Sequence, residues 1–196
     1  TLSAGLFGAA GKAAVAIESA ASDTAFGFAD DKVPMNAANL CPMPTAISQA
    51  VARFGAELDL DMSWQNRGRV EAYKQEAREG IARQLGVDAA EIAIVRNTSE
   101  ANNIVVQGLS LNEGDEVVLW EQNHPSNFVA WDVRAKRHKL RIRHLSVPLD
   151  ATSVDEVVDL FANAVGTATR VVSFTHISNV TGFRLPANEI CAAIRR

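Results

Sequence analysis

Hydrophobic positions in the first half of the chain recur at the spacing of an α-helix. The apolar residues of the segment 45–58 repeat every three or four positions: Ile47, Val51, Phe54 and Leu58. A second helix is predicted over 70–85, because Gly86 follows it in the usual position after a helix. The preceding segment, 33–44, contains three prolines and is expected to be irregular.

The second half alternates short apolar runs with helical patterns. The predicted strands are 92–95, 116–120, 140–145 and 170–174. The predicted helices are 100–109, 126–137, 153–165 and a last one opened by Pro186. Ser153 and Glu156 have the spacing of a capping box. Strands separated by helices require crossover connections, so the pattern predicts an α/β fold with a mainly parallel sheet.

Polar stretches follow three of the predicted strands. They cover residues 96–103, 123–127 and 175–182 and carry hydroxyls, amides and imidazoles. Ligands of open parallel sheets bind beyond the carboxyl ends of the strands. The sequence therefore predicts one shared site at that edge.

Composition and charge narrow the function classes. The 196 residues are 47% hydrophobic and 21% charged, and the formal net charge is −4. This acidic balance argues against general nucleic-acid binding, and no run is apolar and long enough to span a membrane. The basic run 134–143 is interpreted as the solvated end of a helix and the next strand. Cys41 and Cys191 fit no metal or redox spacing, so we interpret them as small buried residues and expect no metal site.

Residues 1–31 are expected to form a leader and linker. The run 1–22 is rich in Gly and Ala, weakly apolar and lacks an initial Met. It has the character of a twin-arginine export signal without its basic start, or of a frayed Ala-rich helix. Both interpretations stay open, so a periplasmic and a cytoplasmic location are both retained.

Three residues or pairs could bind a phosphorylated ligand, and each also has a purely structural interpretation. Thr98 and Ser99 stand at a helix start, where free N–H groups bind anions, although either could simply cap the helix. His124 follows the strand 116–120 and could serve as an ordinary loop residue. Asn179 could bond its own backbone in a turn in which Gly182 takes a positive φ. His176 is interpreted as a buried core residue.

The three motifs together resemble the class V branch of pyridoxal-phosphate (PLP) enzymes, which includes cysteine desulfurases, selenocysteine lyases and isopenicillin N epimerases. The resemblance extends over residues 33–196 and implies the large domain of fold type I, a three-layer structure with a mainly parallel sheet, within a domain 32–196. It implies that Thr98 and Ser99 bind the cofactor phosphate. It further implies that His124 stacks on the ring and transfers protons, and that Asn179 bonds the phenolic oxygen.

The resemblance also suggests a substrate and an assembly. It implies an amino-acid substrate, with Asn36 and Arg67 as weaker substrate-binding candidates, and a homodimer. The isopenicillin N epimerase-like subgroup fits the segments 97–99 and 178–182 best, with a desulfurase or selenocysteine lyase as the alternative.

The Schiff-base lysine of this family is expected beyond Arg196, and no lysine of this chain stands in the required motif. The chain is therefore expected to be the N-terminal part of a longer enzyme and to be inactive by itself. A non-catalytic α/β module that binds another phosphorylated ligand is the second hypothesis.

Overall fold

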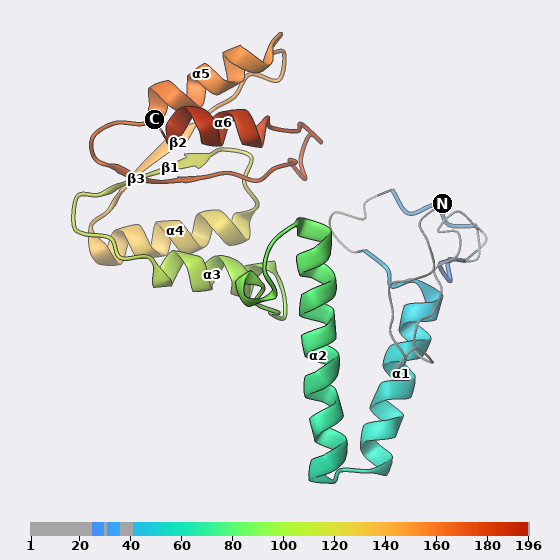
Figure 1. Cartoon of the computed structure of the whole chain (residues 1–196). Helices are drawn as coiled ribbons and strands as arrows, with labels where there is room; N and C mark the ends of the chain where they lie inside the picture. Colours follow the sequence, from blue (N-terminus) through green and yellow to red (C-terminus); the bar gives the residue numbers. More distant parts are fainter. Residues whose placement is uncertain (1–24, 30, 36–40, 196) are drawn as a thin grey trace. The chain divides into compact units, whose positions relative to one another are not determined.

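The computed structural model describes residues 25–29, 31–35 and 41–195. The expected leader residues 1–24 and the substrate candidate Asn36 lie outside this part. The chain divides into two compact units, 1–94 and 95–196, and each is described by itself (Figure 1).

The first unit is a helical hairpin. Helix α1 spans Thr45–Leu60 and α2 spans Trp64–Leu85, followed by the short 3₁₀ helix η1, Ala89–Glu91. Helix α2 begins six residues before the predicted start, because Ser63 caps it by accepting a hydrogen bond from the Asn66 N–H. It ends as predicted at Gly86, whose φ of 70° lies in the left-handed region.

Polar contacts close this hairpin. The buried Asn66 donates through Nδ2 to the carbonyls of Glu57 (3.3 Å) and Asp61 (2.6 Å), which joins the end of α1 to the start of α2. The rings of Phe54 and Tyr73 pack at 5.2 Å between centroids. Few side chains are buried: α1 has no buried residue, and α2 has two.

The predicted strand 92–95 is wrong. These residues are irregular, and Ile94 is 52% exposed. An apolar run becomes a strand only when another strand supplies its hydrogen bonds, and none within the described residues pairs with this one.

The second unit contains a parallel sheet of three strands in the order β2-β1-β3. Its pattern of elements follows the prediction within a few residues. The elements are α3 (Thr98–Gly108), β1 (Glu116–Trp120), α4 (Pro125–His138), β2 (Arg141–Leu145), α5 (Val154–Ala164), β3 (Thr169–Ser173) and α6 (Ala187–Ile194).

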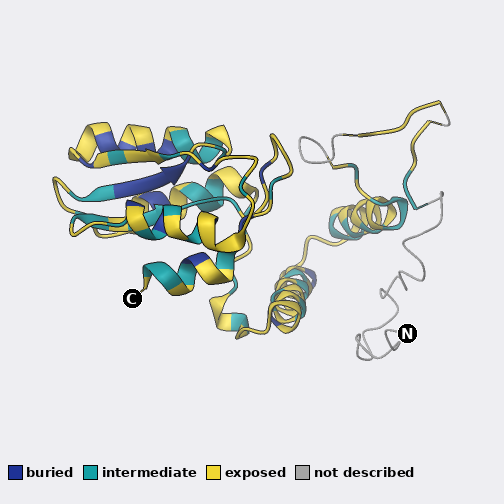
Figure 2. Ribbon diagram, turned by 90° about the horizontal axis from the view of Figure 1, so that it is seen from above, coloured by how far each residue is buried: buried dark blue, intermediate teal, exposed yellow. Residues whose placement is uncertain are grey.

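Helices cover both faces of the sheet, with α3 and α4 on one side and α5 and α6 on the other (Figure 1). Alternate residues of β1 supply the two cores. Val117 and Leu119 pack with Trp131 of α4, whereas Trp120 packs with Phe161 of α5. This central strand is the dark, buried element of Figure 2. The expected three-layer parallel α/β fold is confirmed.

Local details correct several predictions in this unit. Ser153 caps α5 as expected, but the Glu156 carboxylate accepts from the Thr152 N–H rather than from Ser153. Pro186 is the residue before α6 rather than its first residue. Within the basic run, Arg134 is 5% exposed and donates to the Leu109 carbonyl, so this part of the run is not solvated.

Two bulk features complete the description. No helix among the described residues has both the length and the apolar character needed to cross a bilayer. Both cysteines are free; Cys41 is exposed, so its interpretation as a buried residue is wrong, and Cys191 is half-buried.

Candidate functional site at the carboxyl edge of the sheet

Helices α3 and α4 begin at the same edge of the sheet. Near their starts, Asn102 Nδ2 lies 3.4 Å from Ser126 Oγ, and near their ends Arg134 reaches the Leu109 carbonyl. The two helices therefore run in the same direction. Because α4 follows the carboxyl end of β1 after four residues, both helix starts lie at the carboxyl edge.

The start of α3 offers free hydrogen-bond donors. Asn97, not Thr98 or Ser99, caps the helix, since its Oδ1 accepts from the Glu100 N–H at 3.0 Å. The N–H groups and hydroxyls of Thr98 and Ser99 donate to no acceptor in the described part of the chain, and both residues are exposed. Ser99 borders an open surface depression of about 570 Å³. The capping interpretation of Thr98 and Ser99 is therefore wrong, and their donors face solvent.

An ion pair fixes the chain just before this helix. Arg96 contacts both carboxylate oxygens of Glu100, with Nη2 at 3.1 Å and Nε at 3.3 Å, and its backbone N–H donates at 2.7 Å. The guanidinium of Arg96, followed by its N–H, lowers the pKa of Glu100 below its ordinary value. The charge of Arg96 is thus partly compensated by Glu100.

His124 occupies the capping position of α4. Its Nδ1 accepts from the Ser126 N–H at 3.2 Å and lies 2.9 Å from Ser126 Oγ. A backbone N–H can donate only to an unprotonated ring nitrogen, so this network assigns the proton of the neutral ring to Nε2. The side chain is exposed, so the ring face and Nε2 remain accessible to a ligand.

The loop between β3 and α6 presents Asn179 to solvent. The buried Ser178 forms the turn, because its Oγ accepts from the N–H groups of Val180 (3.0 Å) and Thr181 (3.2 Å). Gly182 takes the expected positive φ of 74°. The Asn179 side chain is exposed and has no hydrogen bond to the described residues. The interpretation that Asn179 bonds its own backbone is therefore wrong.

Two side chains link the His124 loop to the Asn179 loop, and sequence reasoning missed both. The buried Asn123 bonds the backbone at Ser173 and Thr175, and the Thr181 hydroxyl donates to Gln122 Oε1 at 2.7 Å. Only the position of Asn123, directly before His124 in a strand-end motif, hinted at such a role.

The predicted site residues are thus brought together pairwise. Asn102 and Ser126 join the helix starts that carry Ser99 and His124, and Asn123 joins the loops that carry His124 and Asn179. That all three line one pocket stays a prediction. Arg67 belongs to the first unit, where its guanidinium lies 5.3 Å above the Trp64 ring.

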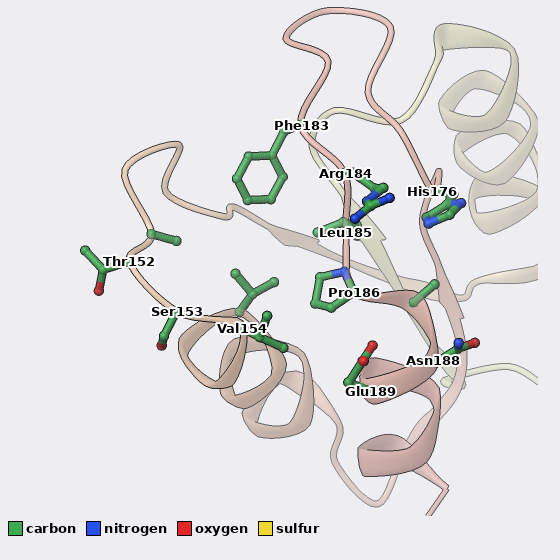
Figure 3. A pocket seen from close by; sticks show the side chains of 13 residues that line it. Thr152, Ser153, Val154, His176, Phe183, Arg184, Leu185, Pro186, Asn188 and Glu189 are labelled. Atoms are coloured by element: carbon green, nitrogen blue, oxygen red, sulfur yellow. The ribbon is translucent and has the colours of Figure 1, made fainter.

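A separate cavity of about 590 Å³ lies between the starts of α5 and α6 (Figure 3). His176 and Arg184 line it from the loop after β3, and Ser153 and Glu189 line it from the two helices. His176 is exposed, so its interpretation as a core residue is wrong. None of the predicted cofactor residues lines this cavity.

Comparisons with known proteins agree on one family. The model of the family "Aminotransferase class-V" matches residues 61–196. A probable cysteine desulfurase of Methanothermobacter thermautotrophicus is 35% identical over 170 residues, which cover 82% of this chain and 40% of that protein. Isopenicillin N epimerase of Streptomyces clavuligerus is 29% identical over 163 residues, covering 83% of this chain and 41% of that protein.

Solved structures share the fold. The cystine C-S lyase C-DES, in complex with its reaction product cysteine persulfide, superposes with a TM-score of 0.80 at 26% identity, over 85% of this chain and 44% of that one. A C-DES mutant with glycine covalently linked to its PLP cofactor gives a TM-score of 0.79 over the same shares. The chain thus spans about two fifths of the length of the relatives it matches.

Proposed function

Because this chain belongs to the class V aminotransferase family, whose members are PLP-dependent enzymes, we propose that it supplies part of the PLP site of an enzyme acting on an amino acid. The observation that carries the proposal is the start of α3. Free N–H groups and two free hydroxyls occur there, beside the start of α4 with its accessible imidazole.

The residues at the start of α3 fit a phosphate group. A helix start combines free N–H donors with a partial positive charge, and the hydroxyls of Thr98 and Ser99 add two donors. Asn97 already satisfies the cap, so neither hydroxyl is needed for the helix itself. In the proposal, Thr98 and Ser99 bind the phosphate and thereby fix the position of the ring.

His124 and Asn179 fit the ring of the same cofactor. The capping bond at Nδ1 orients the imidazole and leaves Nε2 free to hold or release a proton. Since Ser178 forms the turn, the Asn179 amide is free to donate to the phenolic oxygen. When bound, PLP supplies an electron sink for negative charge that develops on the substrate.

The described lysines of the second unit do not serve this site. Lys136 pairs with Asp132 at 2.6 Å, and Lys139 pairs with Glu113 at 3.0 Å. Both lie at the C-terminal end of α4, opposite to the end that carries His124. The lysine that binds the cofactor covalently is therefore proposed to lie outside the described part of the second unit.

The phosphate role has a selective test, in which PLP is compared with pyridoxal, which lacks the phosphate. In the protein from the complete reading frame, the double change Thr98→Val and Ser99→Ala should weaken PLP binding about 10- to 100-fold, the usual cost of losing hydrogen bonds to a charged group. Pyridoxal binding should stay nearly unchanged, since it makes no phosphate contact.

The control for this test is Ser48→Ala, at an exposed hydroxyl of α1. It should leave binding of both compounds at the wild-type level. Equal losses for PLP and pyridoxal in the double variant would contradict the phosphate role, and a wild-type protein that binds neither compound would refute the proposed function.

The role of His124 can be separated from its capping bond. His124→Asn keeps a capping side chain but removes the ring, and should slow turnover of the complete enzyme by about 10²–10⁴, the range for a lost general acid or base. His124→Phe should recover part of the cofactor affinity but not the proton transfer. Full turnover and full PLP occupancy in His124→Asn would make His124 an ordinary capping residue.

Two reactions fit the relatives, and the product distinguishes them. The segments 97–99 and 178–182 support an isopenicillin N epimerase-like enzyme, which would change the configuration of an amino acid. The 35% identical relative supports a cysteine desulfurase as the alternative. Conversion of cysteine to alanine by the complete enzyme, with the sulfur transferred to an added thiol, would favour the alternative, and inversion without loss of a side-chain group would favour the first.

A homodimer is part of the proposal, with Arg67 as a residue for a substrate carboxylate. Light scattering on the complete protein should give twice the mass of one chain. A monomer that retains full turnover would contradict it.

A further inference from the structure

The side chain of Asn123 continues the sheet where the main chain of β1 has left it. The ladder between β1 and β3 ends at the pair Leu119 and Ser173. Beyond that pair, β1 turns into the loop toward α4, a turn closed by the Asn123 N–H on the Trp120 carbonyl at 3.0 Å.

The carboxamide of Asn123 replaces the missing strand partner. Its Nδ2 donates to the Ser173 carbonyl at 2.9 Å, and its Oδ1 accepts from the Thr175 N–H at 2.7 Å. One residue of a parallel strand makes this same pair of bonds, to groups on either side of its partner. The amide orientation is fixed, because a flipped carboxamide would point its NH₂ at the Thr175 N–H and its oxygen at the Ser173 carbonyl.

The two bonds from Asn123 to Ser173 and Thr175 are called the Asn123 clamp, and two further contacts support it. Asn127 Oδ1 accepts from Asn123 Nδ2 at 3.2 Å and lies 3.3 Å from the hydroxyl of Ser173. Asn123 itself is 5% exposed, so water does not readily compete for its bonds. The clamp fixes Thr175, from which the loop with Ser178 and Asn179 departs, and it begins one residue before His124.

We infer that Asn123 is a positioning residue that couples the His124 loop to the Asn179 loop, so that both loops reach one cofactor site; the inference rests on the proposed function. An amide is needed there, because the clamp requires a donor toward Ser173 and an acceptor toward Thr175 at once. A carboxylate offers acceptors only.

The test compares Asn123→Ala and Asn123→Asp with Asn163→Asp, an exposed asparagine of α5, in the protein from the complete reading frame. Hydrogen exchange without PLP should speed up at least about tenfold in peptides covering 174–182, as expected when a protecting hydrogen bond is lost. Peptides covering Glu116–Trp120 should exchange as in the wild type. The control variant Asn163→Asp should leave exchange in both sets of peptides at the wild-type rate.

Cofactor binding is the second measurement on the same variants. Asn123→Ala and Asn123→Asp should weaken PLP binding about tenfold and shift the visible absorption of the bound cofactor, because the Asn179 amide is displaced. Faster exchange with unchanged PLP affinity and absorption would make the clamp merely structural and overturn the inference. Unchanged exchange would overturn it as well.

Failures of the inference and of the proposed function are distinguishable. A wild-type protein that binds no PLP refutes the proposed function, whereas the exchange measurement still decides whether Asn123 holds the loop. If Asn123→Ala does not fold, Gln122→Ala removes the exposed link to Thr181 instead. This variant should speed exchange in 178–182 about two- to threefold, the modest effect of one exposed hydrogen bond, and wild-type exchange there would count against the coupling.

Discussion

The two units bury side chains in very different ways. In the first unit, α1 has no buried residue, and the hairpin is closed by the polar contacts of Asn66 and the ring pair Phe54–Tyr73. In the second, four of the five residues of β1 are buried between two layers of helices. The difference indicates that the sheet is a rigid support for the site, whereas the hairpin depends on few internal contacts.

The largest contrast should come from two tryptophans. Trp131 is 1% exposed in the core between α4 and the sheet, whereas Trp64 at the start of α2 is 77% exposed. Trp131→Ala should lower the free energy of unfolding by about 3–5 kcal/mol, the usual cost of deleting a buried aromatic ring. Trp64→Ala should cost at most about 1 kcal/mol, since it loses only an exposed contact with Arg67.

Urea denaturation of the complete protein measures both values. A cost of Trp64→Ala equal to that of Trp131→Ala would show that the described contacts of the first unit understate what holds it.

A smaller effect is expected at two glycines with positive φ, Gly182 at 74° and Gly86 at 70°. A Cβ at either would meet no atom within 4 Å, so the cost of alanine is backbone strain alone, about 1–2 kcal/mol. The control is Gly108→Ala at the end of α3, where φ is not positive and space is open.

Thermal denaturation of the three alanine variants should lower the melting temperature at Gly182 and Gly86 but not at Gly108. Gly182→Ala should also weaken PLP binding, because it distorts the turn that carries Asn179. A Gly182→Ala protein with a wild-type melting temperature would contradict the described turn.

The smallest expected effect is on the pH dependence of stability, and it comes from one carboxylate in each unit. Arg96 lowers the pKa of Glu100, and the Ser63 N–H, with its hydroxyl, lowers that of Asp61. Because the pKa of each carboxylate is lower in the folded than in the unfolded protein, its contribution to stability is present above the unfolded pKa of about 4. That contribution is lost as pH falls through the folded pKa.

Hydrogen exchange between pH 6 and pH 3 tests whether this stabilisation is lost toward low pH. Peptides at the start of α3 should lose protection toward low pH, and Glu100→Gln should remove that pH dependence. Asp61→Asn should do the same at the start of α2. Protection that increases toward low pH would contradict the assigned contacts.

The layered half of the fold was predictable from the sequence because its signals are local. The continuous apolar run 117–120 marks a strand buried on both faces, and Ser153 marks the start of α5. The strand predicted over 92–95 failed for the opposite reason. Its apolar residues satisfy the pattern, but a strand also requires a pairing partner that no local pattern reveals.

The site was predictable only in part. The rule for strand ends placed His124 at the carboxyl edge through β1, but it did not place Ser99 there, because the strand predicted before α3 is absent and Ser99 reaches this edge only through the parallel run of α3 and α4. It could not show that Asn97 caps α3, that Ser178 rather than Asn179 forms its turn, or that Asn123 bonds Ser173 and Thr175. Those roles depend on side-chain geometry across 50 residues of sequence or on a choice between adjacent polar residues.

The central claim is that Ser99, His124 and Asn179 form one PLP site, and a crystal structure of the complete protein with PLP tests it most directly. The account predicts the phosphate at the N–H and hydroxyl of Ser99, the ring against the imidazole of His124, and the phenolic oxygen within hydrogen-bond distance of the Asn179 amide. A bound cofactor whose phosphate lies away from the start of α3, or whose ring contacts neither His124 nor Asn179, would contradict it.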